Sequence, residues 1–217
     1  MTTADEAYSG TALLVGPNVH RTLAAEQAGL YSLNLDPANR ICRYLRNEVF
    51  AGREITDLSK KLDPHMRALA VSAVETPKTC AESYRISQLL LDALFPESVG
   101  IQPIDPRIDL VASWLWTHLP VRVDLNQLSA LCGLSRSRLA HLFTEQVGIS
   151  IRSYLLWVKM RKAAELFVQD LPRMEVAHAI GFSDSAHLSR SFRSHFALTP
   201  SFLSNKALVQ VLLCEVA

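Results

Sequence analysis

The chain has 217 residues, which is enough for one large domain or two small ones. Apolar residues make up 49% of it and charged residues 20%, a balance typical of globular rather than disordered proteins. No apolar run approaches the ~20 residues of a membrane span, and the polar, acidic residues 1–10 lack the features of a signal peptide. Four scattered cysteines lack metal-ligand spacing, so we expect reduced thiols in a cytoplasmic protein.

The formal net charge of +1 conceals an asymmetry between the two parts of the chain. Residues 1–121 carry 11 Lys and Arg against 14 Asp and Glu, whereas residues 122–206 carry 11 against 6. The second part therefore has a net charge of +5, which favours an anionic partner such as a nucleic acid.

The first 36 residues predict short strands. The apolar run 11–15 is followed by a turn at 16–18, and period-two alternation over 19–23 and 30–35 is typical of half-buried strands. This stretch resembles the last strands of the small cupin β-barrel that precedes the DNA-binding domain in many bacterial regulators. Only a remnant of such a barrel is present. His20 lies where cupin enzymes often place a metal ligand, but no other ligands accompany it, so we predict no metal and no cofactor.

Residues 39–95 predict helices. Ile41, Tyr44, Leu45 and Val49 recur at helical spacing, with Leu58 and Leu62 continuing the apolar side. The pair at 63–64 is a helix start, with an aspartate cap before a proline, and the strongest amphipathic run covers 81–95. These helices either form an internal core or make a homodimer through residues 1–95, and the sequence does not choose between the two.

A proline-rich linker separates two predicted domains. Pro96, Pro103 and Pro106 flank Gly100, and this composition marks a boundary near residue 100. We expect a sensor or dimerisation remnant of strands and helices over 1–100, an all-α domain over 101–206, and an apolar tail over 207–217. The predicted fold class is therefore mainly α, with a small α+β region containing the barrel remnant in front.

The second domain contains two predicted helix-turn-helix units, at about 124–145 and 173–196. In the first, Asp124 caps one helix, Gly133 closes it, and Ser135 caps the next. In the second, Gly181 forms the turn and either Ser183 or Asp184 caps the following helix. A long helix that starts after Ser150 joins the two units.

The two units form an internal repeat. Gly133 corresponds to Gly181 at an offset of 48, and Leu139 and Phe143 correspond to Leu188 and Phe192 at an offset of 49. A generic amphipathic helix does not explain this correspondence.

Residues 105–203 resemble the DNA-binding domain of the AraC/XylS family of bacterial transcription regulators. The matching segments are VDLNQLSALCGLSRSRLAHLFTEQVGISIRSYL, KMRKAAELF and VAHAIGFSDSAHLSRSFRSHFALTPSFL. The resemblance implies seven helices, with the second helix of each unit entering one of two successive major grooves about 34 Å apart. The chain departs from the family at Leu156-Trp157, where basic residues are common, and after Pro200, where the usual C-terminal anchor is weakened although Leu203 can still pack.

The resemblance also implies which residues contact DNA. Base-facing residues are expected from both units: Arg136, Ser137, Arg138 and His141 in the first, and Ser185, Ala186, Ser189 and Arg190 in the second. An arginine at such a position can grip guanine with two hydrogen bonds. Phosphate contacts are expected from the amides of Ser135 and Ser183 and from the side chains of Arg152, Lys159 and Arg193.

The sequence thus predicts a sequence-specific transcription regulator, not an enzyme, that binds double-stranded promoter DNA and activates through RNA polymerase. One alternative is a cupin-type metalloenzyme fused to a DNA-binding module, for which residues 1–100 lack a ligand set. Another is a regulator without a sensor that acts by dimerising or competing for sites. The sequence leaves a small-molecule effector undecided.

Overall fold

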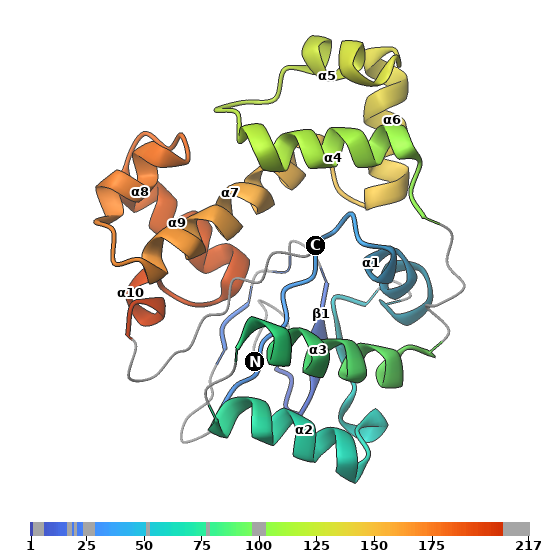
Figure 1. Ribbon diagram of the computed structural model, residues 1–217, viewed down its shortest axis with the longest axis vertical. Coiled ribbons are helices and arrows are strands. Elements are labelled where there is room, and N and C mark those ends of the chain that lie inside the picture. The colour runs from blue at the N-terminus through green and yellow to red at the C-terminus, as the bar shows by residue number, and fades with distance from the viewer. Residues whose placement is uncertain are drawn as a thin grey trace.

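A computed structural model describes residues 1, 7–16, 19, 21–23, 29–50, 53–76, 79–96 and 103–205. Helices dominate the described residues, and their strands form a single two-stranded sheet (Figure 1). No helix in this part of the chain is long and apolar enough to cross a membrane. His20 and the apolar tail 207–217, both singled out in the sequence, lie outside the described residues.

The sheet joins two segments that are far apart in the sequence. β1 (Leu13–Val15) pairs antiparallel with β2 (Ile55–Asp57), with Leu14 opposite Thr56. Between them, α1 (Arg40–Tyr44) begins at the side-chain cap of Asn39 and continues into the π-helix η1 (Leu45–Phe50). A small apolar cluster holds these elements together and consists of Ile41, Leu45, Phe50, Leu58, Leu91 and Phe95.

Two expectations for this region are wrong. Residues 30–35 have no regular secondary structure; instead Tyr31 packs against Met66, Ile86 and Leu90, and its hydroxyl lies 2.9 Å from Ser87 Oγ. The helix expected to run on through Leu58 and Leu62 is replaced by β2 and the 3₁₀ turn η2 (Ser59–Lys61). Of the stretch 19–23, the described residues hold only an isolated bridge at Thr22.

α2 (Pro64–Glu75) and α3 (Cys80–Leu94) pack together on the side of the molecule away from the helices within residues 125–147 (Figure 1). The predicted start of α2 is confirmed, because the carboxylate of Asp63 accepts the Met66 amide and Pro64 takes the first helical position. α3 begins with a reciprocal capping box between Thr79 and Glu82.

Seven helices follow within residues 103–205, as the family resemblance implied. They are α4 (Pro106–His118), α5 (Leu125–Cys132), α6 (Arg136–Val147), α7 (Ile151–Val168), α8 (Arg173–Ala179), α9 (Ser185–Phe196) and α10 (Pro200–Leu203). They form two groups, α4–α6 and α8–α10, and α7 runs from one group to the other (Figure 1).

Each group has its own core, and α7 contributes to both. Tyr154 and Val158, in the first part of α7, are fully buried against α4, α5 and α6. Met160 and Phe167, further along, are buried against α8, α9 and α10. Leu203 of α10 packs into this second core, so the C-terminal anchor retains the contact that the sequence allowed.

Candidate nucleic-acid interface

The first helix-turn-helix unit consists of α5, a tight turn and α6. Gly133 ends α5 at φ 67°, in the left-handed region that favours glycine, and its amide donates to Ser129 O. Ser135 then caps α6 by accepting the Arg138 amide at 3.3 Å. The turn chemistry predicted from these residues is confirmed.

α6 has a buried side and an exposed side. Leu139 and Phe143 are fully buried in the first core, where the Phe143 ring meets Tyr154 edge-on at 5.5 Å. The predicted base-facing residues of this helix are all exposed: Arg136, Ser137, Arg138 and His141. His141 also lies 3.9 Å from the carboxylate of Glu145, one turn further along. The exposed face therefore combines two arginine charges with an imidazole ring that can donate or accept hydrogen bonds.

The second unit repeats the arrangement with α8, a turn at Gly181 and α9. Gly181 has φ 74°, and the cap of α9 is Asp184 rather than Ser183, with its carboxylate accepting the His187 amide at 2.7 Å. This hydrogen bond lowers the pKa of Asp184 below its usual range. A fixed negative charge thus occupies the start of α9, which weighs against a phosphate on the Ser183 amide.

α9 presents a narrower set of free polar groups than the sequence suggested. Ala186, Arg190 and Arg193 are exposed, whereas Ser185 and Ser189 are half-buried. The Ser189 hydroxyl donates to the Ser185 carbonyl at 2.7 Å, so its hydrogen already has an acceptor within the helix. Of the charged side chains that the sequence predicted to contact DNA from α9, Arg190 and Arg193 are both exposed.

One expected phosphate contact is wrong. Lys159 is 5% exposed, and its ammonium donates to Val121 O at 2.7 Å, between the two units. A Cβ added at Gly181 would stand 3.3 Å from the same ammonium, so Lys159 lies against the turn of the second unit. No local pattern marks this burial, because the carbonyl that accepts from Lys159 belongs to Val121, 38 residues away in the sequence. Arg152, in the first turn of the same helix, is exposed as a phosphate contact requires.

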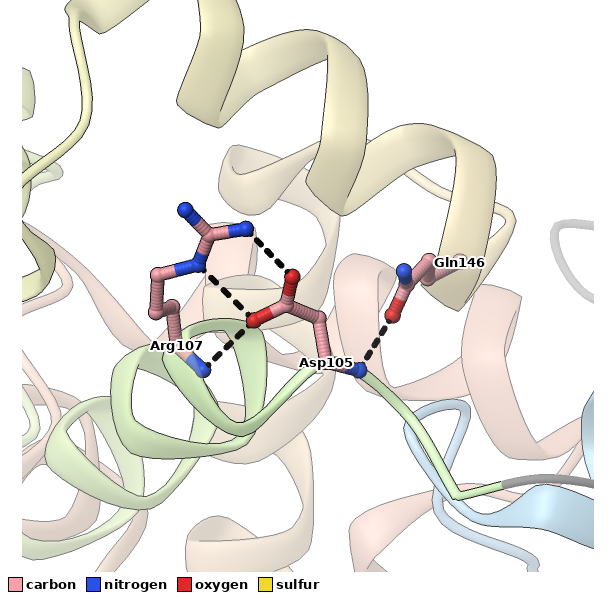
Figure 2. Close-up of polar contacts among 3 residues, drawn as sticks. All are labelled: Asp105, Arg107 and Gln146. Carbon is pink, nitrogen blue, oxygen red and sulfur yellow. Dashed lines mark hydrogen bonds and ion pairs between the residues drawn. The ribbon is translucent and has the colours of Figure 1, made fainter.

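Polar contacts fix the start of α4 to the end of α6 (Figure 2). Asp105 caps α4 and also forms an ion pair with Arg107, and these contacts lower the pKa of Asp105 to about 2. The Asp105 amide donates to Gln146 Oε1 at 2.7 Å, and this hydrogen bond joins the start of α4 to the last turn of α6.

The N-terminal region contacts this domain through a partly buried carboxylate. Asp36 accepts hydrogen bonds from Trp116 Nε1 at 3.0 Å and from the Tyr154 hydroxyl at 3.1 Å. Trp157 stacks on Tyr154 and meets Trp116 edge-on. The apolar patch expected at Leu156-Trp157 is therefore largely used inside the chain, since Leu156 also packs against the second core.

Comparison with known proteins agrees with this geometry. A family model described as a helix-turn-helix domain matches residues 128–206. The uncharacterized HTH-type transcriptional regulator YbfI of Bacillus subtilis is 35% identical over 97 residues, covering 45% of this chain and 34% of the relative. The transcriptional activator RhaS of Escherichia coli is 28% identical over 129 residues, covering 58% of this chain and 46% of RhaS. The crystal structure of an apo ToxT variant from Vibrio cholerae superimposes with a TM-score of 0.51 at 13% identity, covering 79% of this chain and 68% of that one.

The fold and its exposed helices define a double helix-turn-helix DNA-binding domain. The match to a helix-turn-helix family model over residues 128–206 and the similarity to transcriptional regulators agree with the AraC/XylS resemblance drawn from the sequence. The chain spans less than half the length of these two curated relatives.

Proposed function

We propose that this protein is a sequence-specific transcription regulator that places α6 and α9 in successive major grooves and activates transcription. One observation supports the proposal above the others: two repeated helices of one domain each bury an apolar side and expose arginines on the other. A single chain that binds two successive major grooves needs two such helices, because the grooves on one face of the duplex recur about every 34 Å.

Within the proposal, the recognition residues divide by role. Arg190 is well placed to bind guanine with two hydrogen bonds, a contact that contributes about 1–3 kcal/mol of discrimination. Arg136 and Arg138 supply the same chemistry in the first unit. His141 of that unit occupies the position that corresponds to Arg190. Arg152 lies outside both reading helices and serves a phosphate.

The test begins by selecting sites for the full chain from a random DNA pool. We expect Arg190→Ala to weaken binding to the selected site and to relax preference at one base step. Arg152→Ala should weaken binding to every sequence and reduce the slope of log K against log salt by about 0.9. Arg67→Ala, which removes an arginine from α2, is the matched control and should change neither. Wild-type affinity of Arg190→Ala for the selected site would refute the groove assignment.

The remaining partners are part of the same proposal. A homodimer through residues 1–95 is supported by apolar side chains on the outer faces of α2 and α3, where Val71, Tyr84 and Leu89 are each about half exposed. Sedimentation of wild type and Leu89→Asp tests it, since a dimer through this face should dissociate in the variant.

Activation through RNA polymerase, which the proposal assigns to the cytoplasm, is tested by in vitro transcription from a promoter carrying the selected site. Candidate small molecules added to the same assay test for an effector.

A further inference from the structure

The ends of the two reading helices are equivalent in detail. α6 ends at Gly148 (φ 86°) and α9 ends at Ala197 (φ 58°), which correspond at the repeat offset of 49 residues. In each helix the amide of this last residue returns to a carbonyl of the final turn, Thr144 O in one and Arg193 O in the other. The remaining carbonyls of each final turn need donors from elsewhere.

An arginine from the N-terminal region supplies a donor at both ends. Arg46 Nη2 donates to Glu145 O at 3.0 Å and to Gln146 O at 3.4 Å, and Arg21 Nη2 donates to His195 O at 3.0 Å. Gln146 and His195 correspond at the same offset of 49 residues. The same carbonyl of each repeat thus receives a guanidinium from outside the DNA-binding domain, where the helix dipole also favours positive charge.

The packing around these contacts is close. A Cβ at Gly148 would collide with the Arg46 guanidinium, so the arginine lies against the helix end in space that only glycine leaves open. Burial lowers the pKa of both Arg21 and Arg46 below the usual arginine value. Arg21 is also held from its own segment, because its Nη1 donates to Val19 O at 3.1 Å.

A third contact from the same region reaches the helix that joins the units. Asp36 accepts from Tyr154 of α7 and from Trp116 of α4. The N-terminal region therefore touches the first reading helix, the joining helix and the second reading helix. All three positions determine where the two reading helices lie relative to each other.

We propose that Arg21 and Arg46 are positioning residues that hold the two reading helices at one separation, and so set how strictly the protein requires one spacing between its two half-sites. The inference rests on the proposed function, because only a protein that reads two grooves has a spacing requirement. Neither arginine needs to touch DNA, since both lie at the carboxyl ends of the reading helices, away from the capped ends of those helices at Ser135 and Asp184.

The experiment compares spacing preference rather than affinity alone. The full chain, wild type and Arg21→Ala/Arg46→Ala, is titrated against the selected site and against the same site with one base pair inserted or removed between the half-sites. Each lost contact contributes on the order of a two- to tenfold change in an equilibrium constant. We expect the double variant to lose about fivefold or more of the wild-type discrimination against altered spacing. Arg67→Ala, whose guanidinium donates to the nearby carbonyls of Leu62 and Ser59, should keep the full discrimination.

The outcomes separate the two proposals. A uniform loss of affinity at all spacings, with the ratio between spacings unchanged, would show a merely structural role and overturn the inference. Enrichment of a specific sequence by wild type together with unchanged discrimination in the variant would overturn the inference alone. Absence of any enriched sequence would refute the proposed function and the inference with it. If the double variant does not fold, Arg46→Ala and Arg46→Lys replace it, and loss of spacing discrimination in both is then required.

Discussion

Asp36 holds the N-terminal region on the DNA-binding domain, and its replacement by alanine should be costly. Its carboxylate accepts three donors: the Ala38 amide at 2.7 Å, Trp116 Nε1 at 3.0 Å and the Tyr154 hydroxyl at 3.1 Å. Trp116 Nε1 keeps a second acceptor in the Tyr154 oxygen at 3.0 Å. In Asp36→Ala, the Ala38 amide and the Tyr154 hydroxyl are the groups that lose their acceptor.

A buried donor left without an acceptor costs about 1–3 kcal/mol. Two such donors at a partly buried site give an expected loss of about 3 kcal/mol in the free energy of unfolding for Asp36→Ala. Tyr154→Phe removes one donor and one alternative acceptor, so we expect about 1–2 kcal/mol. Because the two side chains bond directly, the double variant should lose about 1 kcal/mol less than the sum of the two single losses.

Unfolding in urea is monitored by circular dichroism. Trp116 fluorescence is a second probe that reports on the surroundings of Asp36. Trp116→Phe measured by circular dichroism alone is the control for the probe. Additive losses within about 0.5 kcal/mol would refute direct coupling between Asp36 and Tyr154.

The same carboxylate predicts a pH dependence. Burial raises the pKa of Asp36 above its usual value, against the opposing effect of its hydrogen bonds. The folded protein therefore binds the proton more readily than the unfolded chain does, and the ionised carboxylate imposes a cost at pH values above its folded pKa. As pH falls through that raised pKa towards about 4, the wild type should gain stability relative to Asp36→Asn. A constant difference between the two proteins over this range would contradict the assignment.

Three further predictions concern the DNA-binding domain. Burial lowers the pKa of Lys159, so wild-type stability should rise relative to Lys159→Met as pH increases towards about 10.5, and parallel pH profiles would contradict this. Gly133→Ala should cost about 1–2 kcal/mol in thermal or urea unfolding, because a left-handed backbone disfavours a side chain and no atom lies within 4 Å of the added Cβ; no loss would contradict this origin. Leu188→Ala should cost about 2–5 kcal/mol, since Leu188 is fully buried in the second core, and a loss under about 1 kcal/mol would show that the core refills the space.

Local chemistry explains what the sequence could predict. Asp63, Asp124 and Ser135 each cap a helix, as their position before an apolar periodic run indicated. A cap depends on residues two or three positions away, so the information lies within a short window. The repeated turns at Gly133 and Gly181 are of the same kind.

Long-range packing explains what the sequence could not predict. Period-two alternation over 30–35 did not make a strand, because a strand also needs a neighbour, and β1 pairs with 55–57 instead. A lysine on a helix is ordinarily predicted to be exposed, but the Lys159 ammonium donates to Val121 O in the loop that covers it. The contacts of Arg21 and Arg46 with the reading helices span 174 and 99 residues, and no local pattern marks them.

α7 contributes to both cores, so the number of its residues fixes the position of one helix-turn-helix unit relative to the other. Its 18 residues form a helix about 27 Å long, and one core packs against each end of it. Inserting or deleting a single residue between Val158 and Met160 would turn one unit against the other by about 100° and shift it by about 1.5 Å. Four extra residues would bring the rotation back to within about 40° but displace the second unit by about 6 Å, more than one base-pair step of DNA. The number of residues in α7 between its two cores therefore sets both the rotation and the distance between the two units.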